Sequence, residues 1–488
     1  MNISTGLNKA LNSPTIMTWT SHVTIFAHGL LVTPLIIIVF DQDQIAVWYL
    51  LQTLVGLGLL ADAGFGYTLS RAVAFFVAGV EKLPSNQDEY KQKLENKGTI
   101  NLDKLASLFS TSYRIYLIIS VIFILVFAPI GMAVVWNVIS LAGHDPLLWA
   151  AYGFTVASTF VDLQTIKWSS YMSGTKRVAE LKRFVTIIGF ARIIGFSVLL
   201  LSKAGVVGLS SYLFTETLFR NLYLRNKVVS WFKMNNVKIR SRLYFDKEIF
   251  NSLWSATWRL GLTTWGNYFT VYGTSIIISQ AHNTALIASF LFTQKILTFV
   301  RRLSEAPFSA NVPGIYMLIA KKKIQNVKAE ISKQLFLFLT LMIGGIFFIG
   351  IFGNYILGIL DVDIRFVSGI IFSVFALAIF LDSHATIQGT VYISTNHVPF
   401  LIPSLVSGAL MIGIGFLVLP YYGLFGLVMT KFLVGLGVNN WYSTYLSLKL
   451  LDWRLTDYLK DVTINGFDYW KGRLINGIRP MLRSTEIQ

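Results

Sequence analysis

The chain has 488 residues, of which 54% are hydrophobic and 13% are charged, and its mean hydropathy is +0.61. An ordinary soluble domain carries about 25% charged residues, so this composition excludes a string of soluble domains. The sequence contains no cysteine, which also excludes disulfide scaffolds, iron–sulfur clusters and cysteine nucleophiles. The composition therefore predicts a polytopic membrane protein.

Twelve stretches of the chain are long and apolar enough to be membrane-spanning helices, which need about 20 predominantly apolar residues. In chain order they cover residues 16–40, 47–70, 113–136, 148–172, 184–202, 206–226, 250–279, 284–300, 334–353, 365–392, 399–419 and 423–448. We therefore expect an all-α polytopic membrane protein with about 12 transmembrane helices in two six-helix lobes around a central cavity.

The basic residues that give the chain its net charge of +17 are unevenly distributed between the predicted loops. With the N-terminus in the cytoplasm, the inner loops 81–112, 173–183, 227–248 and 301–333 hold 22 Lys and Arg, and the outer loops hold one, Lys203. Short loops rich in Lys and Arg stay on the cytoplasmic side. The distribution predicts cytoplasmic termini, and it explains the basic charge without nucleic acid as a partner.

The second spans of the two halves can be aligned. When residues 46–68 are placed over 288–310, Asp62–Gly66 falls on Ser304–Phe308, and a helix-breaking acidic turn is expected in both segments. Two halves of six spans would be parallel repeats. We expect an N-terminal lobe at 1–226, a linker at 227–249, a C-terminal lobe at 250–448 and a polar, basic cytoplasmic tail at 449–488.

The stretch 59–74 is the most specific motif. Its residues Asp62, Gly64, Phe65, Gly66 and Arg71 resemble the second-helix signature of polysaccharide flippases. This family is the O-antigen and exopolysaccharide branch of the superfamily that includes multidrug and toxin extrusion proteins. The resemblance extends to twelve spans with cytoplasmic termini over nearly the whole chain. It implies a two-lobed protein that moves an undecaprenyl-diphosphate-linked glycan from the cytoplasmic to the outer leaflet by alternating access.

The resemblance also implies the setting of this activity. It places the protein in a bacterial inner membrane, with membrane lipids, a polysaccharide polymerase and a chain-length regulator as partners. No cofactor is expected, and coupling would use H⁺ or Na⁺. The sequence contains no HExxH, GxSxG or phosphate-loop motif, so we do not expect an enzyme.

Charged residues inside the predicted spans are the candidate site residues. An Arg or Lys at the bilayer centre costs about 2.5–3.5 kcal/mol on insertion scales, so such residues normally face a cavity or a partner. Arginine suits a diphosphate because its planar fork donates two hydrogen bonds at once. The candidates for binding the anionic head are Arg192, Arg220, Arg259, Lys295 and Lys431. The candidates for coupling or gating are Asp62, Arg71, Glu216 and Asp382.

Several of these residues also have a purely structural interpretation. Glu216 and Arg220 lie four residues apart on one helix and would neutralise each other there. Asp62 and Arg71 would form a clamp that holds the break after the second span. Asp382 lies two residues from His384, and this pair would either carry protons or provide polar packing.

Two other functions remain open. A multidrug or small-molecule cation antiporter of the same superfamily would need carboxylates free to bind a cation, and the predicted spans hold more basic than acidic residues. A polyprenyl-phosphate-dependent membrane glycosyltransferase would place metal-binding acids in the first outer loop, where Asp41 and Asp43 lie. Those enzymes carry larger external regions than this sequence provides.

Overall fold

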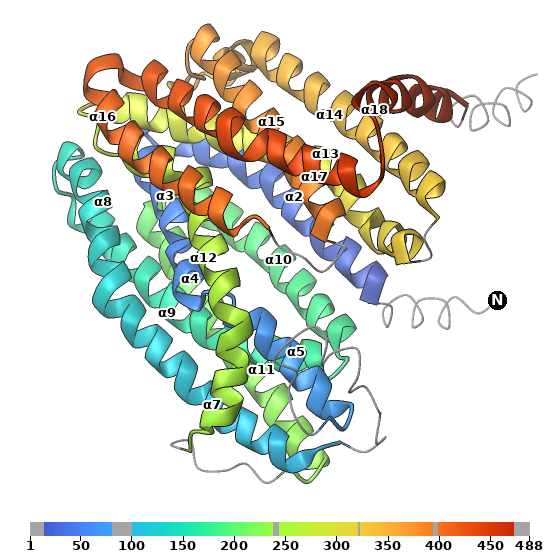
Figure 1. Cartoon of the computed structure of the whole chain (residues 1–488). Helices are drawn as coiled ribbons and strands as arrows, with labels where there is room; N and C mark the ends of the chain where they lie inside the picture. The colour runs from blue at the N-terminus through green and yellow to red at the C-terminus, as the bar shows by residue number, and fades with distance from the viewer. Residues whose placement is uncertain (1–13, 81–99, 238–243, 321–322, 394–398, 473–488) are drawn as a thin grey trace, which may run out of the picture. The chain divides into compact units, whose positions relative to one another are not determined.

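The structure is a computed structural model that describes residues 14–80, 100–237, 244–320, 323–393 and 399–472 (Figure 1). Every regular element in these ranges is a helix. A helix satisfies its backbone hydrogen bonds within one segment, which makes it suitable for lipid, where water is unavailable. The predicted all-α class of a polytopic membrane protein is confirmed. The end of the tail, from residue 473 onwards, lies outside the described residues.

The chain forms two compact units, and the first comprises Met1–Leu291 with Asp361–Ile364. Its helices are α2 (Pro14–Val39), α3 (Gln42–Val55), α4 (Leu57–Asp62), α5 (Phe65–Val77), α7 (Leu102–Ile122), the π-helix η1 (Phe123–Phe127), α8 (Ala128–Leu141), α9 (Pro146–Gly174), α10 (Val178–Leu201), α11 (Gly205–Met234) and α12 (Lys247–Ile278). Helix α9 packs against α3, α5, α7 and α11, α10 packs against α2, and α12 packs against α3, α4, α5 and α7.

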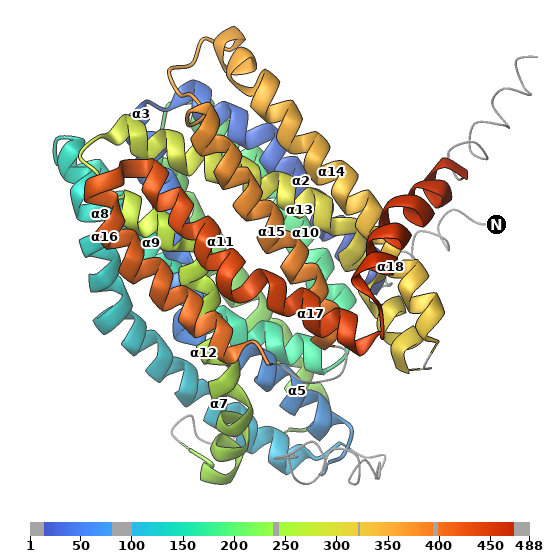
Figure 2. The ribbon, with the colours of Figure 1, turned by 45° about the horizontal axis from the view of Figure 1, so that its top comes forward.

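The second unit comprises Phe292–Leu360 with Arg365–Gln488. Its helices are most of α13 (Thr284–Ala320), α14 (Ile324–Ile359), α15 (Gly369–Ile393), α16 (Leu401–Val434), the π-helix η2 (Gly435–Asn440), α17 (Trp441–Leu450), α18 (Leu455–Lys460) and the π-helix η3 (Asp461–Asn465). Helix α15 packs against α14 on one side and against α16, η2 and α17 on the other (Figure 2). The division into lobes at 227–249 stays a prediction.

Each of the twelve predicted spans corresponds to helical structure. Within the described ranges, seven stretches are apolar and long enough to cross a membrane by themselves. Helices α9, α11 and α12 are more polar, but their 29, 30 and 32 residues exceed the roughly 20 that a bilayer requires. The last two predicted spans are separated by Gly423, whose φ of 56° and ψ of −148° are accessible mainly to glycine.

The second span is broken between α4 and α5, as predicted. Ala63 and Gly64 have φ values of 48° and 80°, in a region that glycine adopts without the steric cost paid by other residues. The break predicted for the second half, at Ser304–Phe308, is wrong, because α13 is continuous from Thr284 to Ala320. The aligned segment contains no glycine, so it lacks the residue that favours a left-handed turn.

Candidate functional site

Asp62 holds the break that precedes α5. One carboxylate oxygen accepts a hydrogen bond from the Tyr116 hydroxyl at 2.8 Å, and the other accepts from the Gly66 N–H at 3.3 Å. A carboxylate at the start of a helix also interacts favourably with the helix dipole. Asp62 forms no ion pair with Arg71 among the described residues, and the exposed Arg71 guanidinium lies over the ring of Phe75. The predicted Asp62–Arg71 clamp is therefore wrong, and Asp62 acts through local hydrogen bonds.

Helix α12 packs directly on this break. The Trp265 indole donates a hydrogen bond to the carbonyl of Leu60 at 3.0 Å. A Cβ atom added to Gly261 would lie 2.9 Å from the Ala63 Cβ, a distance that two carbons cannot adopt without a shift. Glycine at position 261 therefore allows α12 to approach the break closely. Helix α12 packs against the motif and stabilises it.

Two interhelical ion pairs engage four charged residues of α9, α10 and α11. Arg192 donates from Nε and Nη2 to the two carboxylate oxygens of Glu216, at 2.7 and 2.5 Å. Arg220 pairs through Nη2 with Asp162. The predicted pairing of Glu216 with Arg220 is therefore wrong. Glu216 and Arg220 each pair with a residue of a neighbouring helix instead. The guanidinium of Arg192 makes a bidentate contact with the Glu216 carboxylate.

Arg220 and Asp162 also line a pocket of about 380 Å³ among α5, α9, α10 and α11. The hydroxyl-bearing residues around it include Ser70, Thr165, Ser169, Ser170 and Ser173. The Arg220 Nε atom is buried and has no hydrogen-bond partner in the described chain. Leaving a buried donor unsatisfied costs about 1–3 kcal/mol. The pocket therefore combines hydroxyl groups with a guanidinium whose Nε–H donor is unsatisfied among the described residues. We refer to it as the hydroxyl pocket.

In unit 2, Lys431 and Asp382 form an ion pair. The ammonium lies 3.0 Å from a carboxylate oxygen, and the two side chains are 4% and 15% exposed. The π-helix η2 begins beside this pair at Gly435, where an added Cβ atom would lie 3.1 Å from the other Asp382 oxygen. Insertions of this kind within α-helices are frequent at functional sites. Here the small residue leaves room for the carboxylate.

His384 belongs to a separate polar cluster. Its Nε2 atom lies 2.7 Å from the Tyr458 hydroxyl, and that hydroxyl oxygen accepts a hydrogen bond from the Gln388 amide at 2.8 Å. Burial raises the pKa of Tyr458 well above its ordinary value, so the phenol keeps its hydrogen and can donate it to His384. His384 and Asp382 thus have different partners.

The other two candidate cations have no carboxylate partner among the described residues. Arg259, on α12 in unit 1, is exposed, and its guanidinium lies 5.1 Å from the ring centroid of Trp258. Lys295, on α13 in unit 2, is also exposed. The structure thus divides the five candidates into Arg192, Arg220 and Lys431, which are paired with carboxylates, and Arg259 and Lys295, which have no such pair within the described ranges.

The hydroxyl pocket is the part of the site that sequence reasoning missed. Its signal is present in the second half of α9, where Thr165, Ser169 and Ser173 recur every four residues. Such residues share one face of a helix. The pattern predicts a polar face, but the residues of α5, α10 and α11 that complete the pocket depend on tertiary packing.

The fold is similar to that of known membrane transporters. No family model matches the sequence, and no curated protein matches it. An inward-facing transporter of the multidrug resistance MATE family, in the MOP superfamily, aligns over 90% of this chain and 99% of its own, with a TM-score of 0.60 and 12% identity. The lipid II flippase MurJ in an inward closed conformation aligns over 90% of both chains, with a TM-score of 0.57 and 13% identity.

An outward-facing MATE transporter aligns over 91% of this chain and 94% of its own, with a TM-score of 0.55 and 12% identity. The similarity covers nearly the full length of each chain, so it concerns the whole fold. The protein is therefore an all-α, multi-pass membrane protein with the fold of MOP-superfamily transporters.

Proposed function

We propose that this protein is a MOP-superfamily flippase that moves an undecaprenyl-diphosphate-linked oligosaccharide from the cytoplasmic to the outer leaflet by alternating access. The supporting observation is the balance of charges in the spans. All four acids within the predicted spans have a hydrogen-bonding or ionic partner, whereas Arg259 and Lys295 have no carboxylate partner among the described residues. The available charge is therefore positive, which favours an anionic substrate.

The hydroxyl pocket matches the head of such a substrate. Moving a diphosphate and sugars through about 30 Å of hydrocarbon without compensation would be prohibitive. The Arg220 guanidinium provides charge-assisted donors for phosphate. The surrounding serines and threonines both donate and accept, as sugar hydroxyls require. The pocket lies toward the α11 end that precedes the basic segment 227–248, so a cytoplasmic N-terminus would place it in the cytoplasmic half of the membrane.

Cation antiport is the second candidate function, because two of the similar structures are MATE-family transporters. A cationic drug requires a carboxylate whose charge is not already compensated. In unit 1, Asp162 is paired with Arg220 and Glu216 with Arg192. In unit 2, Asp382 is paired with Lys431. Among the described residues, Asp62 is then the one acid of the predicted spans without a cationic partner, and hydrogen bonds from Tyr116 and Gly66 engage both of its oxygens. With three of the four acids paired to cations, the flippase is the better-supported proposal.

The two functions can be separated in proteoliposomes containing the purified protein. We expect translocation of a fluorescent polyprenyl-diphosphate disaccharide, measured by quenching of outer-leaflet label, and no counter-gradient transport of ethidium. Arg220→Ala should slow translocation at least tenfold, because it removes a charge-assisted donor worth about 1.5–3 kcal/mol.

The double variant Asp162→Asn/Arg220→Ala is the matched control for this experiment. If Arg220 only neutralises Asp162, removing both charges should restore translocation. If Arg220 binds the substrate, the double variant should remain slow. Ethidium transport without glycolipid translocation would instead support the antiporter.

The predicted topology gives a further test in intact cells. Because this chain has no cysteine, single cysteines can be introduced at Leu141, Val178 and Asn235 without background labelling. Val178 begins α10 and Asn235 follows α11, in the two basic connections. We expect a membrane-impermeant thiol reagent to label Leu141→Cys only. Labelling of Val178→Cys or Asn235→Cys, with none at position 141, would reverse the proposed orientation.

The resemblance of residues 59–74 to polysaccharide flippases also supports a bacterial inner-membrane location and coupling to H⁺ or Na⁺. It further supports interactions with membrane lipids, a polysaccharide polymerase and a chain-length regulator. The lobes 1–226 and 250–448 would be the moving parts. The paired residues Asp382 and Glu216 are the acids whose protonation could accompany transport.

A further inference from the structure

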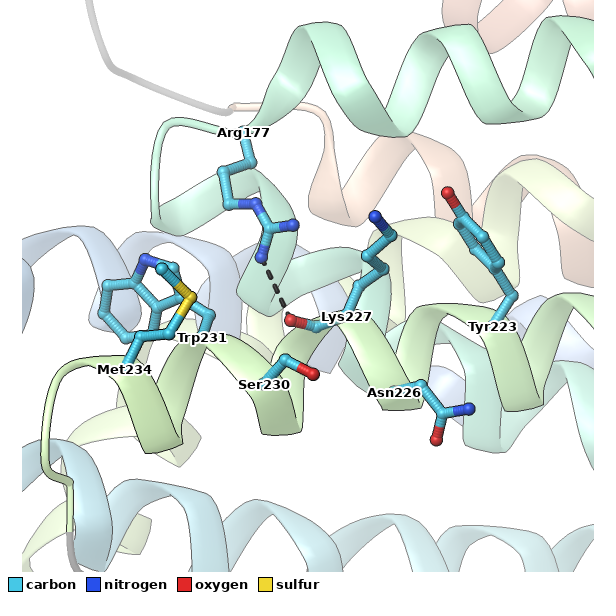
Figure 3. Close-up of a pocket in the computed structure, with 7 residues that line it drawn as sticks. All are labelled: Arg177, Tyr223, Asn226, Lys227, Ser230, Trp231 and Met234. Carbon is cyan, nitrogen blue, oxygen red and sulfur yellow. Dashed lines mark hydrogen bonds between the residues drawn. The ribbon is translucent and has the colours of Figure 1, made fainter.

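A second pocket in unit 1, of about 490 Å³, lies where α10 begins and α11 ends. Its lining combines two cations, two aromatic residues and small polar groups: Arg177, Lys227, Tyr223, Trp231, Asn226 and Ser230, with Met234 at one end (Figure 3). The Arg177 guanidinium reaches from α10 toward α11 and donates a hydrogen bond to the Lys227 carbonyl at 3.1 Å. We refer to this site as the basic pocket.

Within the described part of the chain, the basic pocket carries more positive charge than its ionic partners compensate. Arg177 and Lys227 share a single carboxylate, Glu180, at 2.6 and 3.2 Å. Glu180 is also the only acid in the segments 173–183 and 223–237. The basic residues of the same segments are Lys176, Arg177, Lys182, Arg183, Arg225, Lys227 and Lys233. An anionic ligand would therefore restore the balance.

The position of the basic pocket matches the headgroup layer of a bilayer. The predicted spans end at 226 and begin again at 184 on this side, and the lining residues lie at or just beyond these limits. Tyrosine and tryptophan are enriched at this depth because one part of each side chain is apolar and another is polar. The Tyr223 ring stacks on Phe184 with centroids 4.0 Å apart, and Met234 is 82% exposed. A ligand with both a charged head and an apolar body fits this lining.

From these observations we infer that the basic pocket binds the phosphate headgroup of an anionic phospholipid from the surrounding leaflet. Arg177 and Lys227 engage the phosphate, Asn226 and Ser230 hydrogen-bond to the headgroup, and Trp231 and Met234 contact the glycerol and upper acyl region. Basic pockets between transmembrane helices are known to bind anionic headgroups. This lipid site is distinct from the hydroxyl pocket and does not depend on which substrate is transported.

The test compares two double variants that remove the same charge. Arg177→Gln/Lys227→Gln removes both cations of the basic pocket, whereas Lys176→Gln/Lys233→Gln removes two exposed cations of the same segments that do not line it. Phosphatidylglycerol binding to purified protein in detergent is measured by native mass spectrometry. We expect about 30-fold weaker binding for the pocket variant, about 1 kcal/mol for each cation, and less than a threefold change for the control.

Glu180→Gln gives a test that misfolding cannot imitate, because a gain is expected. Removing the shared carboxylate releases Arg177 and Lys227, so phosphatidylglycerol should bind several-fold more tightly. Phosphatidylcholine and millimolar inorganic phosphate are the probes for other sources of phosphate. Equal binding of phosphatidylcholine, displacement of the lipid by inorganic phosphate, equal losses in the two double variants, or no gain with Glu180→Gln would each overturn the inference.

Discussion

Replacing Arg259 or Lys295 by alanine is expected to reduce glycolipid translocation at least tenfold while leaving the amount of folded protein in the membrane unchanged. Neither residue has a carboxylate partner among the described residues, so their removal strands no buried acid. Each supplies a cationic group in a predicted span, and loss of one charge-assisted contact to the diphosphate is worth about 1.5–3 kcal/mol. Translocation is measured with the fluorescent polyprenyl-diphosphate disaccharide in proteoliposomes.

The same experiment includes two controls. Arg259→Lys should recover part of the activity, because lysine keeps the charge but cannot form the bidentate contact. Lys203→Ala removes an exposed cation from the turn after α10 and should leave translocation unchanged. Normal translocation by well-folded Arg259→Ala and Lys295→Ala proteins would show that these residues do not bind the head. If the alanine variants instead fold poorly, and a second substitution that removes an acid restores folding, Arg259 and Lys295 would have a structural role.

Among the single substitutions named here, Arg192→Ala is expected to cause the largest loss of folding stability. It leaves Glu216, whose side chain is 4% exposed, without its counterion. Breaking a buried ion pair from one side costs about 3–5 kcal/mol. The lower end of that range applies here because the Arg192 side chain is 34% exposed. The change should lower the apparent Tm of the purified protein. This Tm is measured by recording intrinsic tryptophan fluorescence during heating.

Adding Glu216→Gln to Arg192→Ala should recover most of the lost stability, since no uncompensated charge remains. Glu216→Gln alone tests whether the pair has a second role, because the acid is also a candidate for coupling. An Arg192→Ala protein as stable as the parent would contradict the structural role assigned to the pair. A double variant that is stable but inactive would indicate that the charges also serve transport.

The sequence was informative where the physical signal is local. The spans are visible because a bilayer demands about 20 apolar residues in succession, and the break at Ala63–Gly64 is visible because glycine occupies a left-handed turn. The break expected at Ser304–Phe308 was inferred from an alignment, and the continuous α13 shows that an acidic residue and a proline do not replace that glycine.

Charge pairing and pocket formation could not be predicted in the same way. Residues four apart on a helix are neighbours, so the sequence favoured a pair between Glu216 and Arg220. In the folded chain their partners come from α10 and α9 instead, and the spacing of residues along one helix cannot predict partners from other helices. The hydroxyl pocket likewise needs four helices, because α9 supplies half of its lining residues and α5, α10 and α11 supply the others. These features depend on how the helices pack.

The pairing of Arg192 with Glu216 also bears on how the chain enters the membrane. Helix α10 ends at Leu201 and α11 begins at Gly205, so only a short turn separates the two helices. Each would bring an ionised side chain into hydrocarbon if it were inserted alone, at a cost of about 2.5–3.5 kcal/mol on insertion scales. Inserted together as a helical hairpin, they can neutralise each other as they leave the translocon. The ion pair thus provides a physical reason for α10 and α11 to be integrated as one unit during biosynthesis.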